Sequence, residues 1–178
     1  MRFLLYNGWT LRPRIEKGAA VAEKKEEIEI PLVLEKVLSY CLKDAKERME
    51  KGEVVLPFSA LAVGDTLFME LHDADSVDES FASVRKLVSG ASGAQAYGFC
   101  YDGFIESEDH KKYDCVIAQG GVPGAEYGHA IGWRYKADDD GNVTFRGEPI
   151  YVGNCLNYMQ GLELVEPEAE AESEPETE

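Results

Sequence analysis

Apolar residues follow a helical period in residues 30–51 of this chain. Six of them recur at steps of three and four, which is the spacing of one face of an α-helix: Leu34, Val37, Leu38, Cys41, Ala45 and Met49. Pro31 suits a first helical turn, and Gly52 suits the end of the helix. The pattern predicts an amphipathic helix over this range.

A second helix is predicted over residues 76–89. Ser76 and Glu79 form the S-x-x-E pattern of a capping box, and four apolar residues follow on one face: Val77, Phe81, Val84 and Val88. Between the two helices, Ala60–Val63 and Thr66–Leu71 have the composition of short strands. The two residues between them, Gly64 and Asp65, predict a hairpin turn.

Beyond Gly90 the period changes to two, the repeat of β-strands. In Ala94–Ile105, large aromatic residues at 97, 99 and 101 alternate with small ones at 96, 98 and 100. Four more strands are predicted from alternation and turn residues: Tyr113–Gln119, His129–Lys136, Val143–Phe145 and Pro149–Val152. Asp140-Gly141 is a strong hairpin signal between two of them.

These elements predict an α+β domain over residues 29–162. We expect an antiparallel meander sheet of four or more strands, with the two main helices packed on one face. Residues 1–28 are expected to form an N-terminal arm that is partly helical or loose. Residues 163–178 are rich in Glu and lack an apolar face, so we expect a disordered acidic tail.

The charge of the chain is concentrated in this tail. Of 178 residues, 34 are acidic and 18 are basic, a net charge of −16. Residues 163–178 hold eight of the acidic ones, so the rest of the chain carries −8. A polyanion would be repelled, which excludes general nucleic-acid binding. The tail either keeps the protein in solution or docks on a basic partner.

No apolar run reaches the length of a membrane-spanning helix or of a signal-peptide core. We therefore expect a cytoplasmic protein that does not bind membranes. The four cysteines form no CxxC pair, and in a reducing compartment they are expected to be free thiols that act as small buried hydrophobes.

Three segments together resemble a family. They are AYGFCYDGF (residues 96–104), YDCVIAQGG (113–121) and HAIGWRY (129–135). They resemble a loose group of small, uncharacterised bacterial proteins with a tyrosine-aspartate-glycine hairpin, and the resemblance covers about residues 33–152. Glu106–Lys112 departs from the group's short glycine-containing turn. The resemblance implies a single bacterial domain and no particular activity.

Two carboxylates are candidates for chemistry. Asp102 and Asp114 lie in strands that are expected to pair, and two close carboxylates can take different pKa values and act as acid and base. In the structural alternative, Asp102 bonds local backbone beside Gly103, while Asp114 caps a strand end or pairs with Arg134.

Other chemistries have weaker support in the sequence. A thiol nucleophile at Cys100, Cys115 or Cys155 with His129 as base lacks any local signature. The histidines and cysteines show neither CxxC nor HxxxH spacing, so no metal or other cofactor is predicted.

Aromatic residues give the strongest functional signal. Tyr127 and His129 flank a glycine-rich loop and could reach a ligand, and Trp133 beside Arg134 has the composition of an interaction surface. Our first hypothesis is a non-catalytic domain that binds another protein through an aromatic sheet surface or the acidic tail. The alternative is a small enzyme or ligand-binding protein with a site near Asp102, Asp114, His129 and Arg134.

Overall fold

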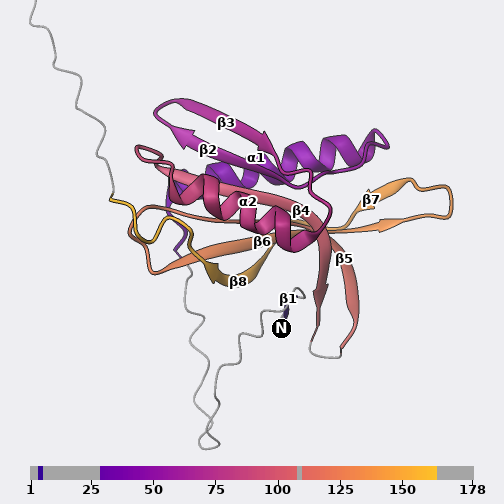
Figure 1. Ribbon diagram of the computed structural model, residues 1–178. Coiled ribbons are helices and arrows are strands. Elements are labelled where there is room, and N and C mark those ends of the chain that lie inside the picture. Colours follow the sequence, from indigo (N-terminus) through magenta and orange to yellow (C-terminus); the bar gives the residue numbers. More distant parts are fainter. Residues whose placement is uncertain (1–3, 6–28, 108–109, 164–178) are drawn as a thin grey trace, which may run out of the picture.

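The computed structural model describes residues 4–5, 29–107 and 110–163 of the chain (Figure 1). Its described part is α+β, as predicted. The helices are α1 (Leu32–Glu50) and α2 (Val77–Ser89). The strands are β1 (Leu4–Leu5), β2 (Phe58–Val63), β3 (Thr66–Leu71), β4 (Ala96–Glu106), β5 (Lys112–Gly121), β6 (Tyr127–Ala137), β7 (Val143–Phe145) and β8 (Ile150–Leu156).

The strands form one antiparallel sheet in the order β3-β2-β4-β5-β6-β7. β1 pairs with the far end of β4, and β8 pairs with β6. Apart from β3 and β4, which β2 separates, strands that follow one another in sequence are neighbours along this path, which confirms the predicted meander. The longest ladder joins β4 to β5, from Tyr97 opposite Gly121 to Glu106 opposite Lys112.

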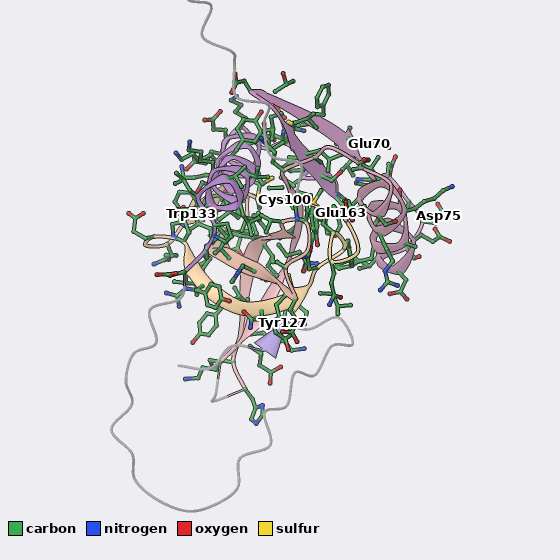
Figure 2. All side chains as sticks on the ribbon, turned by 90° about the vertical axis from the view of Figure 1, so that its left-hand side faces the viewer. Glu70, Asp75, Cys100, Tyr127, Trp133 and Glu163 are labelled. Carbon is green, nitrogen blue, oxygen red and sulfur yellow. The ribbon has the colours of Figure 1, made fainter. Side chains whose placement is uncertain are left out.

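The two helices cover opposite faces of the sheet (Figure 2), so the prediction that both lie on one face is wrong. α1 packs in a core with Ala96 and Cys100 of β4. The α2 residues Val84 and Val88 pack in a separate core with Tyr97 and other aromatic residues of the same strand. Because β4 is apolar on both faces, each face needs its own cover.

Small residues let α1 lie close to its face of the sheet. A Cβ atom at Gly98 would be 2.9 Å from Cγ1 of Val37 and 3.0 Å from Sγ of Cys41. The thiol of Cys100 donates a weak hydrogen bond to the carbonyl oxygen of Cys41 at 3.6 Å. The helix therefore rests almost directly on the backbone of β4.

Aromatic rings hold α2 on the other face. Phe81 makes edge contacts with Phe99 and Tyr101, with ring centroids 4.9 and 5.3 Å apart. The helix begins as its sequence predicts, because the backbone N–H of Glu79 donates to the Ser76 hydroxyl. The central aromatic residues are consequently core, and Tyr97 and Phe99 are fully buried.

Several expectations fall outside the described residues. They concern the arm of residues 1–28, apart from the backbone pairing of Leu4 and Leu5 with β4, and the tail beyond Glu163. Within the described residues, neither helix combines the length and the apolar character needed to cross a bilayer.

The close approach of α1 makes a specific prediction. Gly98→Ala should lower the free energy of unfolding by about 1–3 kcal/mol, since the added methyl group overpacks the contact with Val37 and Cys41. Gly90→Ala is the matched control, because a Cβ there meets only backbone oxygens at 3.6 Å and beyond. Urea denaturation measures both, and equal stability of the two variants would contradict the packing.

Candidate functional site

Asp102 lies on the α1 face of β4, where its carboxylate meets a tyrosine from β6. The hydroxyl of Tyr135 donates a hydrogen bond of 2.7 Å to Oδ1 of Asp102. Desolvation raises the pKa of Asp102, and the charge of Asp114 raises it further, whereas the Tyr135 bond lowers it. The sequence did not identify Tyr135 as the partner of this carboxylate.

Asp114 shares this face, as expected for two paired strands. It stands opposite Phe104, and Asp102 stands opposite Val116, so the two carboxylates are on one side of the β4–β5 ladder. Tyr135 keeps its proton, because its pKa is raised by burial and by the nearby charge of Asp102. Asp102 and Asp114 form a small acidic patch beside the Tyr135 hydroxyl. The two carboxylates can bind a proton or accept a hydrogen bond from a ligand.

Arg134 lies on the opposite face and does not join this patch. It pairs in register with Cys115, whose neighbours Asp114 and Val116 point the other way. Its guanidinium lies over the ring of Tyr113, 5.6 Å from the centroid. The alternative in which Asp114 pairs with Arg134 is therefore wrong.

His129 and Tyr127 lie at the other end of β6. Nδ1 of His129 is 3.1 Å from the hydroxyl of Tyr151, which donates to Asn154 at 2.6 Å. Burial lowers the pKa of His129. His129 lies six positions before Tyr135 in the same strand, a span of about 20 Å. Figure 2 likewise shows Tyr127 and Trp133 at separate places.

Trp133 has a packing role beneath α1. Its indole N–H donates a hydrogen bond of 2.8 Å to the carbonyl oxygen of Gly147. Nζ of Lys46, from α1, lies 5.6 Å from the ring centroids of both Trp133 and Phe145. The six predicted site residues thus belong to four separate places: Asp102 with Asp114, Tyr127 with His129 at the other end of β6, Trp133 beneath α1, and Arg134 on the opposite face.

The thiols are poor candidates for nucleophiles. Burial raises the pKa of Cys41, Cys115 and Cys155 to about 12, and it also raises that of Cys100. At neutral pH these groups are therefore thiols rather than thiolates. Within residues 29–107 and 110–163, no cluster of His, Cys, Asp and Glu is arranged to hold a metal ion.

A buried histidine that the sequence did not single out joins three elements. His72 directly follows β3, and its Nε2 is 2.7 Å from the Ser59 hydroxyl on β2. Its Nδ1 is 2.9 Å from the Ser83 hydroxyl on α2. Burial lowers the pKa of His72, and the charge of Glu70 opposes this effect. Ser59 is buried too, so the arrangement ties the strands to the helix.

The position of β3 at the exposed edge of the sheet is the largest feature that the sequence analysis missed. The strand pairs with β2 on one side, and no other described strand pairs with its other side. Three of its apolar side chains are exposed: Phe68 by 55%, Leu71 by 55% and Met69 by 38%. The sequence predicted the strand, but its place at the edge depends on the pairing of β2 with β4.

Comparisons of the chain with protein-family models, with curated proteins and with solved structures found no match. The interpretation of the site therefore depends on the geometry of this chain alone.

The bond between Tyr135 and Asp102 can be tested by titration. In Tyr135→Phe the carboxylate loses a hydrogen-bond donor that lowers its pKa, so the pKa of Asp102 should rise. Carboxyl-carbon NMR measures the change. Tyr113→Phe is the control, because Tyr113 is on the other face and should leave the titration unaltered. A rise in both variants, or in neither, would contradict the assignment.

His72 predicts a pH dependence of stability. Its pKa is below the ordinary 6.5 in the folded chain, so the unfolded chain binds the proton more readily. The contribution of His72 to the free energy of unfolding should therefore be fully present above pH 6.5 and should be lost as the pH falls below 6.5 towards the folded-state pKa. In His72→Gln the slope over this range should be smaller.

Chemical denaturation at a series of pH values measures that slope. His129→Gln provides the comparison, since it keeps His72 and should keep the His72 part of the slope. If the wild type and His72→Gln show parallel pH profiles, His72 is not responsible.

Proposed function

We propose that this chain is a protein-binding domain, and that it adds an extended segment of its partner to the free edge of β3. The observation that carries the proposal is a six-residue edge strand with exposed Phe68, Met69 and Leu71. Exposed strand edges template the pairing of another chain, a mode in which main-chain hydrogen bonds supply affinity and side chains supply specificity.

The hairpin geometry determines which backbone groups of β3 are available. Val63 and Thr66 close the two-residue turn, and hydrogen-bonded pairs alternate with non-bonded pairs from there. The bond of 2.7 Å from the N–H of His72 to the carbonyl oxygen of Pro57 continues this alternation. The N–H and C=O groups of Leu67, Met69 and Leu71 therefore point away from β2.

The other edge of the sheet has the features that protect edges from pairing. β7 has three residues, and the pairing of β8 with β6 is interrupted by a register shift at Ala130/Ile131. β3 pairs with β2 without interruption from Thr66 to Leu71 and contains no Lys, Arg or Pro. Proteins blunt edges with short strands, bulges, Pro and charged side chains, and of these β3 has only the single carboxylate of Glu70.

Charge defines the kind of partner that fits this edge. β3 carries Glu70, and Asp65 precedes it in the hairpin turn, while Asp73 and Asp75 follow it. A second copy of this acidic chain would be repelled, whereas an apolar strand flanked by Lys or Arg would be attracted. On its inner side the partner strand would meet Tyr40 of α1, whose hydroxyl contacts Sδ of Met69 at 3.3 Å.

We place this activity in a bacterial cytoplasm. Support for the compartment comes from the four cysteines, all free in the structure, since thiols persist in reducing compartments. The bacterial assignment rests on the sequence resemblance.

The experiment removes an outward-pointing donor without disturbing the β2–β3 ladder. Peptides selected from a library of random ten-residue sequences are measured against the wild type, Met69→Pro and Met69→Ala. Proline removes the N–H of Met69, and binding should fall about tenfold. Met69→Ala keeps that N–H and should lose much less.

Hydrogen exchange provides the second readout. A bound peptide should slow exchange at the amides of Leu67 and Met69, and leave Phe68, which already bonds to β2, nearly unchanged. Selected peptides that bind Met69→Pro and the wild type equally well would show that the edge of β3 is not the binding site.

A further inference from the structure

A pocket of about 400 Å³ lies beside α2 and is also lined by Tyr158, in the turn that follows β8. Its lining includes the apolar residues Val77, Phe81 and Ala82. Arg85, Lys86 and Tyr158 also line it, and the guanidinium of Arg85 lies over the Tyr158 ring, 5.5 Å from its centroid. The pocket thus combines apolar side chains with two cations.

We propose that residues 164–178 of this same chain bind in the α2 pocket. The segment follows Glu163 and reads LVEPEAEAESEPETE, with two apolar residues first and then seven Glu and no Lys or Arg. Leu164 and Val165 match the apolar lining residues, and the glutamates that follow match the charges of Arg85 and Lys86.

The chain leaves the described structure close to the pocket. Tyr158 lines the pocket and lies only five residues before Glu163. The intervening turn is closed by bonds from Gln160 N–H to the Asn157 oxygen and from Leu162 N–H to the Met159 oxygen. Leu164 is therefore at most about 20 Å of chain from Tyr158. A tether this short gives an effective concentration of about 1 mM.

The charges of the pocket orient the segment. Asp78 lines the pocket in the first turn of α2 and would repel glutamates. Arg85 and Lys86 are seven and eight residues further along, about two helical turns away. The apolar residues of the segment therefore belong near Val77 and Phe81, and its glutamates belong at the end of the pocket that holds Arg85 and Lys86.

The test uses the full chain and a fluorescent peptide of residues 164–178. A neutral-tail variant, with the seven Glu of this segment changed to Gln, leaves the pocket free. Fluorescence anisotropy at low salt should show this variant binding the peptide about tenfold more tightly than the wild type, whose own segment competes.

Charge reversal identifies the site. In the neutral-tail background, Arg85→Glu/Lys86→Glu should lose the peptide. Lys36→Glu/Lys43→Glu, which makes the same change of charge on exposed positions of α1, should keep most of the affinity. Circular dichroism checks that each variant folds.

Three results would overturn the proposal. One is equal peptide affinity for the wild type and the neutral-tail variant. A second is an equal loss of peptide affinity in both charge-reversed double variants, which would mean that the peptide is attracted by the overall charge of the protein. The third is displacement of the peptide by an equimolar amount of inorganic phosphate, which means an anion site rather than a peptide site. None of these results bears on β3.

Discussion

The structure depends on the unequal sides of one strand. Along β4, residues 96, 98 and 100 are small, and residues 97, 99 and 101 are aromatic. The small side lets α1 approach within van der Waals contact of the backbone, and the aromatic side receives Phe81 of α2. Because β4 is buried on both faces, the fold has three layers at this strand: α1, the sheet and α2.

This arrangement decides what stays exposed. The aromatic rings of β4, which the sequence suggested as part of a binding surface, pack against α2 instead. Tyr97 and Phe99 have no accessible surface. Exposed apolar residues instead gather on the strand furthest from β4 on that side, β3. The functional interpretation therefore moves from the face of the sheet to its edge.

Local patterns gave reliable expectations, because each is decided by neighbours in sequence. The N-cap at Ser76, the Gly64-Asp65 turn and the helix α1 can each be predicted without knowledge of tertiary contacts. Non-local placement was harder. Alternation in β4 shows that its sides differ, but not which helix covers which side. Tyr135 and Asp102 are 33 residues apart, and nothing local joins them.

One site prediction could have been improved from the sequence. Trp133 and Arg134 are adjacent in a strand, so they must point to opposite faces, and they could not form one surface. Whether Arg134 meets Asp114 depended on the register of β5 against β6, which the side-chain pattern leaves open. The same holds for His72, because its partners come from β2 and α2.

The two-sided packing of β4 is tested most directly by NMR contacts. A NOESY spectrum should show the methyl groups of Val37 close to the Hα protons of Gly98, and the ring of Phe81 close to that of Phe99. The account predicts both sets of contacts in one spectrum. Contacts from α1 and α2 to the same alternate set of β4 residues would contradict it.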